Sequence, residues 1–336
     1  MRVFFIITVC IGFFMYLDKG DMLISSYLIS RITSFVLPII APLHKGWNET
    51  EIQNTRKMME PGSNKVNIGF TFIDIPLDKN DHRHKQELYL QNNSRALYRI
   101  YIPVKIDVMK KVIMWFHGGG FVVGNIRSDH EICGKISNET NSIVINVNYG
   151  LAPENKFPIA LQDSIDSVKW VYNNIYLYGG NKNNIHLIGE SAGGNLVLSI
   201  IPYLKPIQIK SIISIYPPLH LFTYTTSHWK YANFNGFLTL NHLAKIASSY
   251  LTDIKESEDT RMNPSLLTNK SLHEYPNTLI ILAKYDILFD DGILFAKKLA
   301  KNKVFVDVKI YPDIHGFFGR FGFGSKALEE TILHLK

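Results

Sequence analysis

A serine enclosed by small residues is the strongest chemical signal in the sequence. It lies in the run Gly189-Glu190-Ser191-Ala192-Gly193, between an apolar stretch typical of a buried strand and an apolar-faced helix. A strand-to-helix turn this sharp needs small residues around the serine, and Gly189, Ala192 and Gly193 supply them. The serine hydroxyl is then exposed at the end of a sheet, where backbone N–H groups of the new helix face an approaching molecule. Ser191 is therefore the predicted nucleophile.

A second glycine-rich segment follows a predicted apolar strand earlier in the chain. It reads His117-Gly118-Gly119-Gly120-Phe121. Three consecutive glycines cost backbone entropy, so a special backbone geometry explains them better than stability does. Such a loop can direct backbone N–H groups at an oxyanion, and it accompanies the G-x-S-x-G turn in hydrolases. The two motifs in this order favour acyl-transfer chemistry over a tight glycine turn with a bystander serine.

Ser191 also needs a base, because a serine hydroxyl is unreactive at neutral pH. Among the twelve histidines, His315 is the best candidate, since it follows a predicted strand and precedes a glycine. The acid that orients the base is expected after a strand between the two, because hydrolases of this type run serine, acid, histidine along the chain. Asp286 fits this order. Asp290 and Asp291 are rivals, but they begin the next predicted helix, where N-capping would explain them.

Alternating strands and helices must position these residues. Strands are predicted at 67–75, 96–102, 112–116, 143–149, 185–189, 211–215, 277–283 and 305–311, and helices at 159–176, 292–302 and 325–335. This alternation predicts an α/β fold with a mostly parallel central sheet that helices cover on both faces. Ligands are expected at the carboxyl ends of its strands.

Two segments outside this alternation are predicted to form a helical cap. The first, 21–64, contains apolar periodicity typical of helices and includes a predicted helix at 47–60. A lid, a membrane-surface helix and an ordinary core helix all fit its pattern. The second is an insertion at about 217–263, which is rich in aromatic residues and includes a predicted helix at 240–251. Such an insertion is usually functional or a lid, although a packed helical hairpin also fits. The rest of 65–336 is the predicted core.

The first 20 residues form a hydrophobic segment. Residues 3–17 carry no charge, but this run is shorter than the ~20 residues that span a bilayer comfortably. The bulky and charged residues at 16–18 do not resemble the cleavage site of a secretory signal. An uncleaved anchor, a removed signal, and a buried or interfacial helix all fit, and membrane association is favoured. An anchor would give a single-pass protein with a lumenal or external catalytic domain; a secreted or cytoplasmic protein is the alternative.

Composition argues against several other classes of protein. The net charge of +7 is spread along the chain, so no nucleic-acid surface is predicted. Of the two cysteines, Cys10 lies in the N-terminal apolar run, so a disulfide with Cys133 is not expected. The histidines and cysteines lack the spacing of a metal site, and we predict neither a metal ion nor another cofactor. The sequence supports no prediction of the oligomeric state.

Five motifs together resemble the hormone-sensitive lipase branch of the α/β-hydrolases. They are H-G-G-G-F at 117–121, Y-G-L-A-P-E-N-K-F-P at 149–158, G-E-S-A-G-G-N at 189–195, Y-D-I-L-F-D-D-G at 285–292 and H-G-F at 315–317. The resemblance implies the α/β-hydrolase fold, a cap above the site, and hydrolysis of small to medium apolar esters or lipid esters. The hydrophobic N-terminus is similar to that of the membrane-anchored arylacetamide deacetylase and neutral cholesterol ester hydrolase relatives.

The resemblance also implies a role for each motif residue. Ser191 is the nucleophile, His315 is the general base and then the general acid, and Asp286 holds the imidazole. The implied oxyanion hole consists of backbone N–H groups from Gly118, Gly119, Gly120 and Ala192. The residues that support the two motifs are His117, Gly189, Glu190 and Gly193.

Two positions depart from the family pattern. Gly150 stands where the family usually has an arginine, which puts a structural ion pair in doubt. Glu190 stands where many members have an aspartate. Neither change removes a catalytic group.

Two other functions fit the same motifs. An amide deacetylase would use the same three residues, so the residues do not separate it from an esterase. A ligand-binding receptor on the same fold belongs to a different class, and relatives of that kind typically lose a triad member. The presence of all three residues therefore favours an enzyme.

Overall fold

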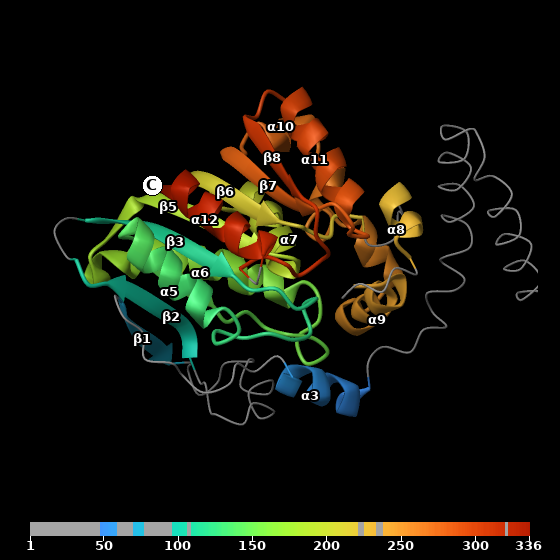
Figure 1. Ribbon diagram of the computed structural model, residues 1–336, viewed down its shortest axis with the longest axis horizontal. Helices are drawn as coiled ribbons and strands as arrows, with labels where there is room; N and C mark the ends of the chain where they lie inside the picture. The colour runs from blue at the N-terminus through green and yellow to red at the C-terminus, as the bar shows by residue number, and fades with distance from the viewer. Residues whose placement is uncertain are drawn as a thin grey trace, which may run out of the picture.

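One eight-stranded sheet forms the centre of the computed structural model (Figure 1). The structure describes residues 48–58, 70–76, 96–105, 109–220, 225–232, 238–319 and 322–336. Within these ranges the strand order is β1-β2-β4-β3-β5-β6-β7-β8. The strands are β1 (Phe70–Pro76), β2 (Ala96–Pro103), β3 (Lys110–Phe116), β4 (Ile143–Val147), β5 (Gly180–Glu190), β6 (Ile209–Ile215), β7 (Asn277–Ala283) and β8 (Val306–Tyr311).

Helices cover both faces of this sheet. The α-helices of the described ranges are α3 (Glu49–Met58), α5 (His130–Thr140), α6 (Ile159–Asn174), α7 (Ala192–Ser199), α8 (Thr226–Lys230), α9 (Leu240–Tyr250), α10 (Asn269–Leu272), α11 (Phe289–Lys301) and α12 (Phe323–Leu335). The 3-10 helices are η2 (Ile175–Tyr178), η3 (Ile201–Tyr203), η4 (Ile254–Glu258) and η5 (Pro264–Leu266). Helices α6, α7 and α11 contribute to the core on one face, whereas α5 and α12 contribute to the core on the other (Figure 1).

The two core layers follow from the alternation of side chains along each strand. In β3, Val112, Met114 and Phe116 join the layer that contains α6 and α11. Ile113 and Trp115 join the opposite layer with α5 and α12. Successive side chains of a strand point to opposite faces, so a strand buried on both faces is apolar throughout. This is why the central strands appear in the sequence as continuous apolar runs.

The strand register brings the ends of the central strands to the same edge of the sheet. Strands β1, β2 and β4 pair antiparallel, and the pairs from β4 through β3 to β8 are parallel. Phe116, the last residue of β3, pairs with Gly189 of β5. Ile215 of β6 pairs with Ile281 of β7. The segments that leave β3, β5, β7 and β8 therefore emerge side by side.

The predicted fold class is confirmed, with differences in detail. The prediction of a mostly parallel sheet covered on both faces is correct, and β7 has the predicted bounds. Strand β5 begins at Gly180, five residues before the predicted 185. Its first half was not predicted because residues 181–184 are polar and lack the apolar pattern of a buried strand. Helix α5 was not predicted, since its few apolar residues make no clear helical stripe.

Some sequence predictions fall on residues that the structure does not describe. The hydrophobic segment at 1–20 and the first part of the predicted cap at 21–47 lie outside the described residues. In the described ranges, no helix combines the length and the apolar character needed to cross a bilayer.

Helices α3, α8 and α9 lie to one side of the sheet rather than over its faces (Figure 1). Helix α3 is the helix predicted at 47–60, and α9 is the helix predicted at 240–251. Lys245 of α9 donates a hydrogen bond to Glu51 of α3, at 3.0 Å between Nζ and Oε1. This contact joins two segments that are far apart in the sequence.

A buried arginine attaches α3 to the core. Arg56 is 2% exposed, and its guanidinium binds both carboxylate oxygens of Glu154 at 3.0 and 2.9 Å. Its remaining donors reach the carbonyl oxygens of Val122 and Ala152 at 3.0 and 3.1 Å. Arg56 thus forms a buried ion pair with Glu154, four residues after Gly150. The same side chain binds α3 both to the segment after β3, through Val122, and to the segment after β4, through Ala152 and Glu154.

We predict that Arg56→Ala destabilises the protein strongly. Removing one partner of a buried ion pair leaves the other charge uncompensated, so the free energy of unfolding should fall by about 3–5 kcal/mol. Urea unfolding measures this. The matched control is Lys205→Ala, which breaks an exposed pair with Glu274 and should cost no more than about 1 kcal/mol. Equal stability of the two variants would contradict the role of Arg56.

Candidate active site

A strained turn between β5 and α7 holds Ser191. Its backbone has φ 53° and ψ −114°, a conformation that residues with a side chain rarely adopt. A Cβ at Gly189 would lie 2.1 Å from the carbonyl oxygen of Gly193, and a Cβ at Gly193 would lie 2.0 Å from that of Phe116. Both positions therefore require glycine, as the sequence predicted. The Ser191 N–H donates to the Ile215 carbonyl at 2.9 Å, which ties the turn to β6.

The three residues predicted as nucleophile, base and acid lie in one hydrogen-bonded series. Ser191 Oγ is 2.9 Å from His315 Nε2, and His315 Nδ1 is 2.7 Å from Asp286 Oδ2. An ionised carboxylate only accepts hydrogen bonds, so Nδ1 carries the proton and Nε2 can accept from the serine hydroxyl. The second oxygen of Asp286 accepts the backbone N–H of Leu288 at 2.9 Å. These bonds and the burial of Asp286 and His315 fix the orientation of the imidazole.

A tyrosine that sequence reasoning missed supports the same imidazole. Tyr216 follows β6 directly, and its ring packs on His315 with 4.6 Å between centroids. Its hydroxyl donates to Glu190 Oε1 at 2.6 Å and accepts the N–H of Phe318 at 3.3 Å. Tyr216 thus connects Glu190, the neighbour of the nucleophile, to the base. Its place at the carboxyl end of a predicted strand was a signal that could have found it.

The glycine loop after β3 faces the same space as Ser191. Gly119 and Gly120 have φ of 121° and 61°. A Cβ at Gly119 would lie 2.1 Å from the carbonyl oxygen of Val123, and one at Gly120 would lie 2.6 Å from Ile246 Cδ1. In the part of the chain that the structure describes, no backbone carbonyl accepts the N–H groups of Gly119, Gly120 and Ala192. Their N–H groups are therefore available to a bound oxyanion.

His117 stabilises this loop as a neutral side chain. Its Nδ1–H donates to the carbonyl oxygen of Gly118 at 2.7 Å, and its ring stacks on Tyr149 at 4.3 Å between centroids. The Tyr149 hydroxyl donates to the His117 carbonyl at 2.7 Å. Complete burial lowers the pKa of His117 to about 4, so the ring carries no charge at neutral pH. His117 therefore positions Gly118 and does not supply a charge.

A cavity of about 460 Å³ opens in front of these groups. This volume is within the range of small-molecule sites. One side is formed by Ser191, His315 and the glycine loop, and the other by residues of α3 and α9. Its apolar lining consists of Phe121, Val123, Pro218, Leu238, Leu243, Ile246 and Leu288. Among the described residues, no cluster of His, Cys, Asp and Glu side chains could hold a metal ion.

The prediction that Asp290 and Asp291 cap the N-terminus of the next helix is wrong. Neither side chain caps α11, whose first turn has Leu288 at the N-cap without a side-chain hydrogen bond. Asp290 accepts the N–H of Ser227, and Asp291 accepts the N–H groups that follow Pro218. Their partners are 63 to 72 residues away in the sequence, so a local pattern could not reveal them.

Comparisons with known proteins agree with this geometry. A family model described as alpha/beta hydrolase fold matches residues 113–319. An arylesterase of Saccharolobus solfataricus is 30% identical over 249 residues, which cover 73% of this chain and 80% of the arylesterase. Arylacetamide deacetylase of Mus musculus is 23% identical over 331 residues, which cover 80% of this chain and 82% of that protein. A crystallised hyperthermophilic esterase from Pyrobaculum calidifontis has a TM-score of 0.74 and 26% identity, with 90% of this chain and 97% of that chain covered.

The chain therefore belongs to the alpha/beta hydrolase fold family. The resemblance to the hormone-sensitive lipase branch, inferred from five motifs, is confirmed by the matching family and relatives.

We predict that Tyr216→Phe impairs both stability and turnover. It removes a hydrogen bond to the carboxylate of Glu190, and such bonds contribute about 1.5–3 kcal/mol. Thermal unfolding and kcat for a nitrophenyl acetate would be measured.

The matched control is Tyr275→Phe, which removes a similarly buried hydroxyl that donates to the carbonyl of Leu198. It should cost only about 0.5–1.5 kcal/mol and leave kcat unchanged. If both variants had the same kcat, the hydroxyl of Tyr216 would have no part in orienting His315.

Proposed function

We propose that the protein is a serine carboxylic-ester hydrolase that works through an acyl-enzyme. The observation that carries the proposal is the series Asp286, His315 and Ser191, which opens on the same cavity as the glycine loop. The esterases among the relatives support the reaction class. The assignment of each residue to a step is our inference.

In the first half of the reaction, His315 Nε2 takes the proton of the Ser191 hydroxyl as Oγ attacks the carbonyl carbon of the ester. The carbonyl oxygen becomes an oxyanion, and the N–H groups of Gly119, Gly120 and Ala192 bind it. Gly118 belongs to the same proposed oxyanion loop. Asp286 holds the imidazole and stabilises the imidazolium that forms. The first half ends when the oxyanion collapses: the bond from the carbonyl carbon to the alcohol oxygen breaks, the imidazolium of His315 gives its proton to the leaving alcohol, and the acyl group remains on Ser191 Oγ.

The second half of the reaction repeats these roles with water. His315 then takes a proton from water, whose oxygen attacks the acyl carbon. Collapse of this second oxyanion breaks the bond to Oγ, returns the proton to Ser191 and releases the carboxylic acid.

The cavity supports small to medium apolar esters as the substrate class. Its walls are mainly apolar, and its volume accommodates a ligand of modest size. Two segments, 21–64 and 217–263, are proposed as the cap above a core that makes up the rest of 65–336. Residues of α3 and α9 from these segments line the cavity.

Amide hydrolysis is the nearest alternative, because it needs the same three residues. The similarity to an arylacetamide deacetylase supports amide hydrolysis as the alternative. A matched pair of an aryl acetate and an acetanilide would distinguish the two activities. A receptor without activity is disfavoured, since the three residues are present and hydrogen-bonded.

We predict that Ser191→Ala abolishes turnover of a short-chain nitrophenyl ester, with a loss on the order of 10⁶-fold in kcat. Asp286→Asn should cost ~10⁴-fold, because asparagine would favour the wrong imidazole tautomer. Asp290→Asn should cost far less, since Asp286 and not Asp290 binds His315. Ser199→Ala, which changes a buried serine of the same helix, is the control and should leave kcat unchanged. Substantial activity in Ser191→Ala would exclude the proposed mechanism.

Membrane association through residues 1–20 is a separate proposal that rests on the sequence alone. The uncharged run at 3–17 supports it. We predict that the full chain sediments with membranes and that deletion of 1–20 releases it with its esterase activity intact. Fractionation followed by an esterase assay measures both. A full-length chain found wholly in the supernatant would contradict this proposal and leave the proposed reaction untouched.

A further inference from the structure

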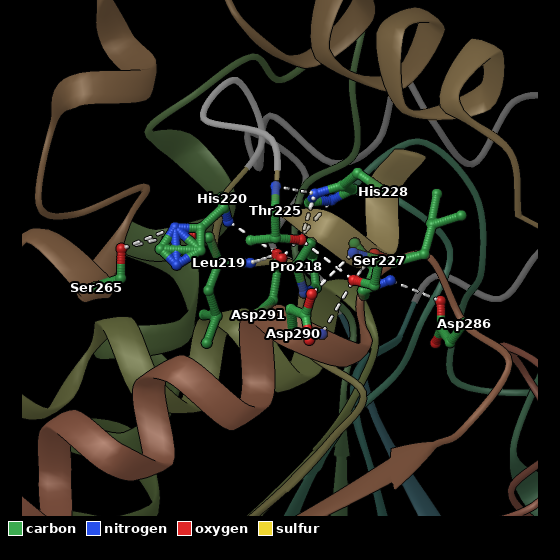
Figure 2. A network of polar contacts seen from close by, with 12 residues as sticks. Pro218, Leu219, His220, Thr225, Ser227, His228, Ser265, Asp286, Asp290 and Asp291 are labelled. Carbon is green, nitrogen blue, oxygen red and sulfur yellow. Dashed lines mark hydrogen bonds and ion pairs between the residues drawn. The ribbon is translucent and has the colours of Figure 1, made fainter. Parts of the chain in front are cut away.

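A second pair of a carboxylate and an imidazole lies next to the loop that carries Asp286. His228 of α8 and Asp291 of α11 both have fully buried side chains, with 3.6 Å between Nε2 and Oδ1 (Figure 2). The proposed reaction uses neither residue. Burying two ionisable groups costs free energy unless they make specific contacts, so their contacts indicate what they do.

The hydrogen bonds of His228 define its tautomer. Its Nδ1 accepts the backbone N–H of Thr225 at 2.9 Å, so the proton of the neutral ring lies on Nε2. Burial lowers the pKa of His228, which keeps the ring neutral at pH 7. The Nε2–H therefore faces the carboxylate of Asp291. The other oxygen of Asp291 accepts the N–H groups of Leu219 and His220 at 2.8 and 2.9 Å.

A second set of bonds joins α8 directly to the acid loop. Ser227 N–H donates to Asp290 Oδ2 at 2.8 Å, and Asp290 N–H donates back to Ser227 Oγ at 3.0 Å. The Ser227 hydroxyl donates to the carbonyl of Ile287 at 2.7 Å. Ile287 directly follows Asp286 in the chain, and Figure 2 draws Asp286 together with Ser227 and Asp290. The segment around α8 is thus attached at several points to residues 286–291.

The same network reaches the wall of the cavity. Pro218, which directly precedes Leu219, lines the cavity, and so does Leu288. The N–H of Leu288 binds Asp286, and its carbonyl accepts the N–H of Asp291 at 3.1 Å. A shift of residues 219–220 and of α8 would therefore move a wall of the cavity and the loop of the triad acid together.

We propose that His228 and Asp291 are positioning residues, which fasten residues 219–220 and helix α8 to the loop of Asp286. The pair sets the geometry of the acid and of the adjoining cavity wall without touching the substrate. The inference rests on the proposed function for its effect on turnover. Its structural part, the attachment of residues 219 and 220, can be tested without any substrate.

Three variants test the pair. Asp291→Asn keeps an oxygen for the N–H groups of Leu219 and His220 but turns an amide N–H₂ toward the Nε2–H of His228. These two donors oppose each other, so we expect kcat for a nitrophenyl acetate to fall ~10-fold. This corresponds to a rise of about 1.4 kcal/mol in the activation free energy. His228→Gln keeps an N–H donor that can face Asp291 and should resemble the native protein. In the double variant, the glutamine oxygen introduced at position 228 can accept from the amide N–H₂ introduced at position 291, and kcat should recover.

Hydrogen exchange gives the readout that is independent of activity. The N–H groups of Leu219 and His220 should exchange faster in Asp291→Asn than in the native protein, and the double variant should restore their protection. Asp163→Asn is the matched control, because Asp163 is a buried acid that accepts the N–H of Gly150 elsewhere in the core. It should leave exchange at 219 and 220 unchanged.

The pH dependence of stability adds a second check on Asp291. Burial, with a smaller contribution from Asp286, raises the pKa of Asp291 to about 6, while His228 and the N–H groups of Leu219 and His220 oppose the rise. His220 and Asp290 are the other titratable groups of the network. Because the pKa of Asp291 rises from its ordinary 3.8 to about 6 on folding, its ionisation costs stability, and this cost falls progressively as the pH drops from about 6 toward 3.8. The native protein should therefore gain stability relative to Asp291→Asn between pH 7 and pH 5.

The inference fails if Asp291→Asn keeps native kcat and native exchange at residues 219 and 220, or if the double variant is no better than Asp291→Asn. Should Asp291→Asn not fold, Ser227→Ala removes the two bonds of the serine hydroxyl, with the N–H of Asp290 and the carbonyl of Ile287, and must raise the same exchange rates and lower kcat. Native values in Ser227→Ala would then overturn the proposal. An inactive native chain would contradict the proposed function only, since the exchange results need no substrate.

Discussion

The close approach of the turn at Ser191 to the end of β3 is the constraint on which the site depends. A side chain at Gly193 would collide with the carbonyl of Phe116, so α7 can begin this near to β3 only because residue 193 is glycine. The pairing of Phe116 with Gly189 then places the glycine loop beside the serine. The strained backbone of Ser191 persists because β5, β6 and α7 fix both of its sides.

Buried polar contacts connect this rigid centre to the segments above it. Arg56 attaches α3 to the segments after β3 and β4, and Asp291 attaches the start of the 217–263 segment to the loop of Asp286. Both contacts place a charged group in an interior where an unpaired charge is costly. Each therefore favours one arrangement of the cavity walls over others, in a way that apolar packing alone would specify less strictly.

The sequence predicted the sheet and the three central residues because their signals are local. Ser191, Asp286 and His315 each lie within four residues after the end of a strand, and parallel strands end at a common edge. Arg56, Tyr216 and His228 were not predicted, since their partners in other elements are 26 to 102 residues away and depend on how the elements pack. The same reason explains why Asp290 and Asp291 were misread as helix caps. Residues 1–47 lie outside the described residues, so the anchor prediction rests on hydropathy alone.

A fluorophosphonate probe tests the central claim most directly, because it reacts with a serine only where a base and an oxyanion site act on it together. The native full-length protein would be treated with the probe and its adducts located by peptide mass mapping. Our account predicts one covalent adduct, on Ser191, which is absent in Ser191→Ala and forms far more slowly in His315→Ala. An unlabelled Ser191, or labelling that is unaffected by loss of His315, would contradict it.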